Sequence, residues 1–512
     1  MYASVQTGAL CGVDAVPITV EVDQGPGIQN FFLAGLPDGA VREARVRVKA
    51  AMENSGFEWP MRRLTLNLAP ADLRKDGTSY DLPIALAILA STGDLSEFAL
   101  QEMQQYLVIG ELSLDGELRP VRGALPMAIC ARDQGLRGII LPAGNAHEAA
   151  LVQNIEVIAA PHLNDAIDFL RGHAPDLRVQ GRPPEELLRR ATPLFDMADV
   201  RGQYAAKRAL EVAAAGGHNV LMVGPPGSGK TMLAKRLLTI LPEMSFDEAL
   251  ETTKVYSVSG LTASGVLMVQ RPFRSPHHTI SDVGMVGGGS GVPRPGEVSL
   301  AHNGVLFLDE LPEFRRNVLE VMRQPLEDGN VAINRSLVTI QYPARMMLVA
   351  SMNPCPCGHL GDPGHECIDS PLQIASYRNR ISGPLLDRID IQLDVPAVTF
   401  RDLRKDTAEE TSATIRARVD AARERQLQRY ADRGIACNAH IGPREIRDFC
   451  QVDDAGNRIL EMVVDRLGMS ARAFDRILKV ARTIADLEGV DTIEARHLTE
   501  AVQYRKLDRR MG

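Results

Sequence analysis

A glycine-rich stretch of the chain has the pattern of a phosphate-binding loop, or P-loop. Its residues are Gly224, Pro225, Pro226, Gly227, Ser228, Gly229, Lys230 and Thr231. They follow an apolar run over residues 219–223 and precede a helical pattern over 232–238, the strand, loop and helix context that this motif requires. Such glycines let backbone N–H groups point at phosphate oxygens, and the helix start adds partial positive charge. We expect Lys230 to reach the β- and γ-phosphates of ATP and the Thr231 hydroxyl to hold Mg²⁺.

Polar side chains follow two further apolar runs downstream of this loop. The run over 304–308 ends in Asp309 and Glu310, and the run over 346–352 ends at Asn353. Buried parallel strands read as continuous apolar runs and present polar residues at one edge of a sheet. We expect Asp309 to hold Mg²⁺ through water, Glu310 to polarise the attacking water and Asn353 to position it. Buried strands often end in an acid, so this assignment depends on the P-loop upstream.

Three of the seven cysteines lie in one short loop, over residues 355–369. Zn²⁺ takes four ligands from Cys, His or carboxylate. The thiols available are Cys355, Cys357 and Cys367. Asp369, His365 or His359 is available as the fourth ligand, and the alternative is a proline- and glycine-rich loop without metal. An odd number of cysteines argues against a disulfide framework.

The bulk composition is that of a globular protein with several domains. The chain has 512 residues, of which 45% are hydrophobic and 24% charged, with a net charge of −8. That charge excludes a protein coated all over by nucleic acid but allows a basic channel. No apolar run is long enough to span a bilayer, and the first residues lack a signal pattern, which predicts a cytoplasmic protein without a membrane partner.

The order of apolar runs and turns predicts three folded parts. Residues 1–172 alternate short apolar runs with glycine turns and helical patterns, which indicates an α+β domain. Residues 173–196 contain few large apolar residues and read as a linker. Residues 197–397 read as an α/β core that contains the P-loop, and residues 398–512 as a small helical domain.

Individual elements can also be predicted. Apolar residues at helical spacing predict helices over 40–55, 199–215, 411–433 and 470–485. Alternating residues over 64–68 predict a strand.

Two segments of the first part resemble the proteolytic domain of Lon-type proteases, whose fold is shared with the ribosomal S5 protein family. They are residues 74–86 and 110–123. By this resemblance Ser79 occupies the position of the catalytic serine, but the positions of its lysine base hold Leu125 and Met127. A serine without a base is a poor nucleophile at neutral pH. The resemblance therefore implies a protease-inactive domain that acts as a scaffold or binds a partner.

The remaining motifs together resemble an AAA+ ATPase of the magnesium-chelatase branch with a C-terminal helical lid. Besides the P-loop and its acids, they include Leu-Leu-Asp-Arg at 385–388 and Ser-Ala-Arg at 470–472. Over essentially the whole chain the sequence is similar to the ComM/YifB family, most specifically over residues 271–278, 295–302 and 353–358. This resemblance implies a hexameric, ATP-driven DNA motor for branch migration or helicase action in natural transformation. The alternative is a chelatase-type ATPase that remodels a protein partner.

The resemblance also implies roles for three arginines. Arg388 would stabilise the transition-state charge on ATP bound to the next subunit, and its alternative is an ion pair with Asp387 or Asp390. Arg472 would contact the phosphate of its own subunit and couple hydrolysis to lid motion. Arg476, one turn further on, is the alternative for that role.

Two insertions are candidate loops for single-stranded or branched DNA in the pore of such a ring, and the alternative is that they are plain surface loops. The first spans residues 271–296 and contains Arg271, Arg274, His277, His278 and Arg294. The second, over 331–340, reads as a hairpin with Asn334, Arg335 and Ser336 at its turn.

Relatives in this family carry Cys-x-Cys twice, whereas here the second pair is Cys367-Ile368-Asp369, which leaves zinc an open question.

Overall fold

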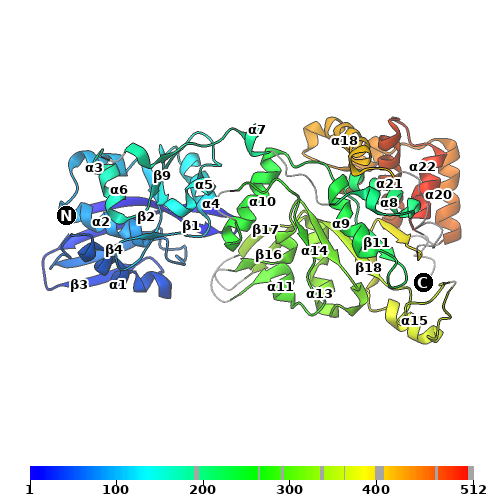
Figure 1. Ribbon diagram of the computed structural model, residues 1–512, viewed down its shortest axis with the longest axis horizontal. Helices are drawn as coiled ribbons and strands as arrows, with labels where there is room; N and C mark the ends of the chain where they lie inside the picture. The colour runs from blue at the N-terminus through cyan, green and yellow to red at the C-terminus, as the bar shows by residue number, and fades with distance from the viewer. Residues whose placement is uncertain are drawn as a thin grey trace.

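The computed structural model describes residues 1–173, 175–188, 195–262, 266–289, 293–334, 339–362, 364–397, 409–467 and 471–505. The N-terminal part lies at one end of the long axis, a parallel-sheet core lies in the middle, and a helical part lies at the other end (Figure 1). The described helices include none whose length and apolar content would let it span a bilayer.

The first sheet of the N-terminal part has the strand order β1-β2-β4-β3. Its elements are β1 (Tyr2–Cys11), β2 (Asp14–Gly25), β3 (Asn30–Ala34), α1 (Gly39–Asn54), β4 (Arg63–Ala69) and α2 (Asp81–Thr92). Leu64, Leu66 and Leu68 are the buried side chains of β4 and alternate with more exposed residues. Helix α2 is buried along almost its whole length and packs against β1 and β2. The helix predicted over 40–55 and the strand predicted over 64–68 are confirmed.

The second sheet of this part has the order β10-β9-β8-β5. Its strands are β5 (Tyr106–Val108), β8 (Gly138–Pro142), β9 (Glu156–Ala160) and β10 (Arg178–Val179), with the small hairpin β6 (Glu111–Leu112) and β7 (Leu118–Arg119) and the helices α3 (Glu97–Met103), α4 (Ala124–Asp133), α5 (Ala146–Ala149) and α6 (Leu163–Leu170). Composition places β10 in the linker, but Arg178 contacts Glu156 and the ring of Phe169, so this polar segment belongs to the sheet. The short helix α7 (Pro184–Leu187) follows.

The core contains a five-stranded parallel sheet with the order β12-β15-β18-β11-β19. Its strands are β11 (Val220–Val223), β12 (Phe273–Arg274), β15 (Val305–Leu308), β18 (Met347–Met352) and β19 (Ile391–Asp394). The three runs predicted as buried strands are β11, β15 and β18, and each is buried over its whole length because helices cover both faces. Their carboxyl ends meet at one edge of the sheet.

Alternate residues of the central strands face opposite sides. On one side, Val220 and Met222 pack with α8 (Tyr204–Gly216) and α9 (Lys230–Ile240). On the other side, Leu221 and Val223 pack in a second cluster. Its helices include α11 (Asp282–Val286), α12 (Glu297–Leu300), α13 (Arg316–Val321) and α16 (Gly383–Leu386). Helix α8 begins later than predicted, because Met197–Asp199 form a 3₁₀ turn and Gln203 has a left-handed φ of 53°.

The predicted hairpin of the core is present. It is formed by β16 (Asn330–Asn334) and β17 (Thr339–Pro343), which follow α14 (Arg323–Asp328). Its turn, with Arg335 and Ser336, lies outside the described residues. The other insertion contributes β12 to the sheet and forms the small hairpin of β13 (Gly287–Gly288) and β14 (Arg294–Pro295).

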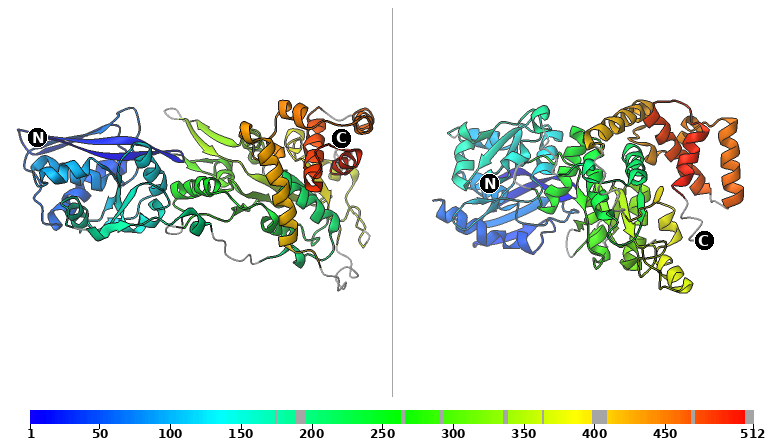
Figure 2. Two further views of the ribbon diagram at one scale, coloured as in Figure 1. Left: turned by 90° about the horizontal axis from the view of Figure 1, so that it is seen from above. Right: turned by 45° about the vertical axis from the view of Figure 1, so that its right-hand side comes forward.

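The helical part begins with the predicted long helix, α18 (Ser412–Arg429), which packs against α8 and α9. The other helices are α19 (Pro443–Phe449), α20 (Asp454–Leu467), α21 (Ala471–Glu488) and α22 (Ala495–Gln503). At the opposite end of the core, α10 (Phe246–Ser259) packs against α4 of the N-terminal part. The long β1–β2 hairpin also points toward the core (Figure 2), where Gly12 lies close to the backbone of Gln341 in β17.

Candidate active site

The P-loop follows β11 and needs its glycines for two reasons. Gly227 and Gly229 have left-handed φ values of 75° and 91°. Gly224 is packed so closely that a Cβ there would lie 2.1 Å from the carbonyl oxygen of Val395. The loop therefore has a tight backbone path that other residues would disturb, and it leads directly into the start of α9 at Lys230.

Lys230 lies folded back onto the loop that carries it. Its Nζ donates to the carbonyl oxygens of Gly224 at 2.7 Å and Pro225 at 2.9 Å, and to Oδ1 of Asn353 at 3.4 Å. Burial lowers the pKa of Lys230. Lys230 and Asn353, which were both predicted as site residues, therefore meet at the carboxyl edge of the sheet. Phosphate oxygens can replace the two carbonyl oxygens as acceptors for Lys230.

Asp309 is held by two hydroxyl groups. Thr231 Oγ1 donates to Oδ2 of Asp309 at 2.9 Å, and the hydroxyl of Ser351 donates to the other carboxylate oxygen. The hydroxyl of Thr231 at the start of α9 and the carboxylate of Asp309 after β15 suit Mg²⁺, which keeps several waters and takes few protein oxygens. Sequence reasoning missed Ser351, although a serine inside the apolar run of β18 was a usable signal.

Glu310 occupies a strained backbone position beside this pair. Its φ is 54°, in the left-handed region that non-glycine residues rarely adopt, and its backbone N–H donates to Oδ1 of Asp309 at 3.1 Å. Its carboxylate is half-exposed and lies 3.8 Å from Nδ1 of His278. The structure places His278, which was predicted as part of a DNA-contacting loop, next to Glu310.

Arg388 lies at the opposite edge of the same sheet. It precedes β19, which runs parallel to β11, whereas the P-loop follows β11. Its guanidinium contacts Glu327 and donates to the carbonyl of Pro384 at 2.7 Å, so the partners Asp387 and Asp390 considered from sequence are wrong.

Asp390 has other partners. Arg476 donates to it at 2.6 Å, and His218 lies 3.2 Å from it. Burial alone would raise the pKa of Asp390, but the hydrogen bond with His218 and the charge of Arg476 outweigh burial and hold the pKa below its ordinary value. Arg476 is thus committed to an ion pair within its own chain, which favours Arg472 as the residue available to a nucleotide.

Arg388, Arg472 and Arg476 line one cavity of about 850 Å³. The cavity is also lined by Asn219, which precedes β11, and by Asp390, which precedes β19, so it lies at the amino edge of the sheet. No residue from 224 to 231 lines it. The structure therefore does not bring Arg472 to the P-loop of its own chain, contrary to prediction, because the helical part covers the other edge.

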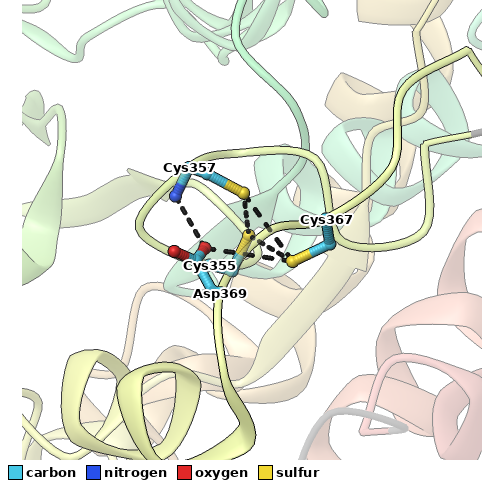
Figure 3. Close-up of side chains that lie close together, drawn as sticks. All are labelled: Cys355, Cys357, Cys367 and Asp369. Atoms are coloured by element: carbon cyan, nitrogen blue, oxygen red, sulfur yellow. Dashed lines mark hydrogen bonds between the residues drawn. The ribbon is translucent and has the colours of Figure 1, made fainter.

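The cysteine cluster lies in the loop after β18 (Figure 3). The sulfur atoms of Cys355, Cys357 and Cys367 are separated by 3.4, 3.6 and 3.7 Å, and Oδ2 of Asp369 lies 3.9 Å from Cys367 Sγ. Tetrahedral Zn²⁺ with Zn–S near 2.3 Å requires sulfur separations of about 3.8 Å. The four side chains therefore fit zinc. Burial raises the pKa of the Cys355 thiol to about 12.

The histidines of this loop lie in a separate cluster. His359 Nδ1 and His365 Nδ1 both approach Oδ2 of Asp362, at 3.4 and 3.0 Å. Asp369 is instead grouped with the thiols, and its Oδ2 accepts the backbone N–H of Cys357 at 2.8 Å. Of the possible fourth ligands considered from sequence, the structure brings Asp369 to the cysteines and leaves His365 and His359 with Asp362.

Comparison with known proteins identifies the family. The Escherichia coli protein YifB is 47% identical over 507 residues, which is 99% of this chain and 97% of that protein. The Haemophilus influenzae competence protein ComM is 45% identical over 516 residues, with 99% and 98% covered. The chain belongs to the ComM/YifB family. The magnesium-chelatase 38 kDa subunit of Rhodobacter capsulatus is 26% identical over 229 residues, which is 41% of this chain and 61% of that subunit.

Three family models match successive parts of this ComM/YifB family member. They are subunit ChlI of Mg-chelatase over residues 20–145, magnesium chelatase subunit ChlI over 196–403, and the C-terminal part of magnesium chelatase subunit ChlI over 409–505. The parallel sheet and P-loop are consistent with this AAA+ group. The protein is therefore a magnesium-chelatase-like ATPase of a group that uses ATP with Mg²⁺ and forms oligomers.

Two arginines of the insertion over 271–296 hold it to the core. Arg274 donates to both carboxylate oxygens of Glu297 at 2.6 and 2.7 Å. Arg271 donates to the carbonyl of Pro242 at 2.7 Å and to Glu248 at 3.0 Å. Both guanidinium groups are therefore paired within the fold, and contact of this insertion with DNA stays a prediction.

The N-terminal part of this ComM/YifB family member has apolar residues at the positions where Lon-type proteases are expected to carry the lysine base. Leu125 and Met127 are buried apolar residues of α4. Asp81, two residues after Ser79, is bound by Arg47 through hydrogen bonds of 2.7 and 2.9 Å. Burial raises the pKa of Asp81 to about 6 despite this pair. These contacts support a structural role for the segment around Ser79.

Proposed function

We propose that this chain is a ring-forming, ATP-driven DNA motor that migrates branches or unwinds recombination intermediates in natural transformation. The observation that carries the proposal is the division of the ATP site. Lys230, Thr231 and Asp309 lie at one edge of the core sheet, whereas Arg388 and Arg472 lie at the opposite edge. A ring with ATP between subunits brings one edge of each chain to the other edge of its neighbour. The near full-length similarity to the competence protein ComM supports DNA as the substrate.

In this mechanism the chain's own residues bind ATP and prepare a water molecule. The backbone N–H groups of the P-loop and Lys230 hold the phosphates, and Thr231 and Asp309 orient Mg²⁺. When bound, Mg²⁺ neutralises charge on the phosphates. Glu310 accepts a hydrogen bond from the attacking water and polarises it, and Asn353 positions that water beside Lys230.

The neighbouring chain completes the site. Arg388 leaves Glu327 and contacts the γ-phosphate of the next subunit, where it stabilises the charge that develops during transfer. Arg472 contacts the same nucleotide from its place on α21 and couples hydrolysis to movement of the helical part. A hexamer of cytoplasmic chains is the assembly that we propose, with the β16–β17 hairpins lining its pore as DNA contacts.

We also propose that Cys355, Cys357, Cys367 and Asp369 hold a structural Zn²⁺. The support is the match between their separations and a tetrahedral site, together with the backbone N–H of Cys357 that orients Asp369. A site with four protein ligands is closed, so this zinc orders the loop and does not itself bind the attacking water or the nucleotide.

The alternative function is a magnesium-chelatase-type ATPase that remodels a protein partner. The family models named for subunit ChlI favour it, since they match the N-terminal, core and C-terminal parts. The two functions differ in their response to DNA, because a chelatase motor has no reason to respond to it.

The deciding experiment measures ATP hydrolysis by the full chain with no DNA, single strands, duplex and branched junctions. We expect junctions or single strands to stimulate hydrolysis several-fold, and Lys230→Ala to abolish both hydrolysis and junction movement, because the phosphates lose their main positive contact. A rate that is the same with every DNA would reject the DNA motor in favour of the alternative. Junction movement by Lys230→Ala at the wild-type rate would also reject it.

A further inference from the structure

The cysteine loop starts from the residues that complete the ATP site. Asn353 lies two residues before Cys355, and its Oδ1 accepts from Lys230 at 3.4 Å. The preceding residue, Met352, accepts the backbone N–H of Gly224 at 3.2 Å. Only Pro354 separates Cys355 from Asn353. A displacement of Cys355 is therefore expected to move the backbone at 352–353, which holds both Asn353 and Gly224, the first P-loop residue.

The turn over residues 355–358, which carries the first two thiols, packs on the P-loop itself. Gly358 donates its backbone N–H to the carbonyl of Cys355 at 3.1 Å and has a left-handed φ of 85°. A Cβ at Gly358 would lie 2.6 Å from Cδ and 2.9 Å from Cγ of Pro226. No side chain fits between Gly358 and the P-loop, so the backbone of Gly358 packs directly on the ring of Pro226.

The far end of the cysteine loop returns to the same place. Asp369 is followed by α15 (Pro371–Arg378). The guanidinium of Arg378, the last residue of α15, donates to the carbonyl of Pro354 at 3.1 Å. The loop thus leaves the ATP site at Asn353 and comes back to it through α15, with the four proposed metal ligands in between.

We propose that the cysteine cluster is a metal-dependent brace of the ATP site. Zn²⁺ bound by Cys355, Cys357, Cys367 and Asp369 closes the loop, and the closed loop presses its turn at Gly358 against the P-loop and keeps α15 on Pro354, next to Asn353. Closing a loop with a metal removes conformational freedom that the chain would otherwise have. Hydrolysis of ATP therefore depends on zinc, although the metal contacts neither nucleotide nor DNA. The inference rests on the proposed ATPase and zinc site.

The first experiment removes the metal through Cys367→Ser, with Cys11→Ser in the N-terminal part as the matched control. The measurements are zinc content, affinity for a fluorescent ATP analogue, hydrogen exchange over residues 224–231 and 353–358, and the ATPase rate. We expect Cys367→Ser to lose zinc, exchange faster over both segments and hydrolyse ATP about 10- to 100-fold more slowly, since small displacements of positioning groups are costly. Cys11→Ser should match the wild type in every measurement.

The second experiment keeps the metal and disturbs only the contact. Gly358→Ala is compared with Gly361→Ala, whose φ of 82° is nearly the same but whose Cβ would meet no atom within 4 Å. Both variants carry similar backbone strain and retain all four ligands. We expect Gly358→Ala to keep its zinc and lose nucleotide affinity about tenfold or more, and Gly361→Ala to keep both. Equal losses in the two variants would overturn the brace.

The outcomes separate this inference from the proposed function. Zinc-free Cys367→Ser with wild-type hydrogen exchange and ATPase rate would overturn the brace and leave the ATPase in place. Wild-type protein that binds no zinc would overturn it as well. A wild type without ATPase, but with zinc-dependent protection of the P-loop, would support the brace and contradict the proposed motor.

Discussion

At the scale of single residues, the ATP site contains partners that no motif names. Ser351 donates to Asp309 from the neighbouring strand, and His278 lies beside Glu310 although it comes from an insertion. The first contact forms because β15 and β18 are adjacent. The second forms because the insertion brings His278 to the carboxyl end of β15. The orientation of the two acidic residues therefore depends on side chains far from them in sequence.

Ser351→Ala tests this orientation. The substitution removes a hydrogen bond to a carboxylate, which is worth about 1.5–3 kcal/mol, so we expect an ATPase rate about 10-fold lower and a higher Mg²⁺ requirement. A titration of the rate against Mg²⁺ measures both. Ser299→Ala is the control, because Ser299 is equally buried but its hydroxyl has no hydrogen-bond partner among the residues that the structure describes. Identical Mg²⁺ curves for Ser351→Ala and the wild type would show that Ser351 has no role in holding Asp309.

Asp390→Asn tests the ion pair that attaches α21 to the core. A carboxyl whose pKa is depressed on folding contributes stability above its unfolded pKa of about 4, and this contribution is lost as the pH falls further. Removing one partner of a buried pair costs about 3–5 kcal/mol, so we expect a lower thermal midpoint at pH 7 and a smaller difference from wild type below about pH 4. Asp387→Asn changes the same charge nearby and is the control. If the difference in thermal midpoint between Asp390→Asn and the wild type stays constant from pH 7 to pH 3, this account is wrong.

At the scale of elements, the strand order decides which residues share an edge. Strands β11, β15 and β18 end beside one another, which gathers the P-loop, Asp309 and Asn353, whereas the segment before β19 places Arg388 at the other edge. The hairpin β16–β17 packs instead against α10 and Val13 of the N-terminal part. The proposed DNA contact and the proposed site of hydrolysis are therefore on different elements, so we expect mutation to separate them.

Arg335→Ala tests whether the proposed DNA contact can be separated from hydrolysis. Arg335 lies in the sequence between β16 and β17. We expect weaker stimulation by DNA, roughly threefold or more, with an unchanged rate in the absence of DNA, because each phosphate contact adds to affinity. The stimulation should also become less sensitive to salt. Arg132→Ala, an exposed arginine of the N-terminal part, is the control. Full stimulation by DNA in Arg335→Ala would remove this residue from the proposed contact surface.

At the scale of the whole molecule, the two halves of the proposed ATP site lie at opposite edges of the core sheet. The helical part packs over the amino edge of the sheet, where Arg472 lines a cavity with Arg388, and the P-loop lies at the carboxyl edge. The N-terminal part contacts the core through α10 and through the tip of the β1–β2 hairpin, near β17. It is therefore placed beside the proposed DNA hairpin and away from the nucleotide.

Mixing two inactive variants tests the divided site. Lys230→Ala and Arg388→Ala should each abolish hydrolysis. In an equal mixture that is allowed to exchange subunits, about a quarter of the interfaces pair an intact Lys230 with an intact Arg388. We expect the ATPase rate to recover to about that fraction of wild type. No recovery in a mixture shown to contain both variants in one ring would mean that Arg388 acts within its own chain.

The sequence alone was sufficient for the residues whose chemistry is local. The P-loop is one continuous segment, and a buried strand that ends in acids is recognisable from its apolar run, so Lys230, Thr231, Asp309 and Asn353 were predicted together and lie together. Only the tertiary structure decided contacts between distant segments: Ser351 with Asp309, Arg388 with Glu327, and Asp369 rather than His365 with the thiols. The physical reason is that side-chain partners depend on strand order and on the packing of the helical part, which local periodicity does not encode.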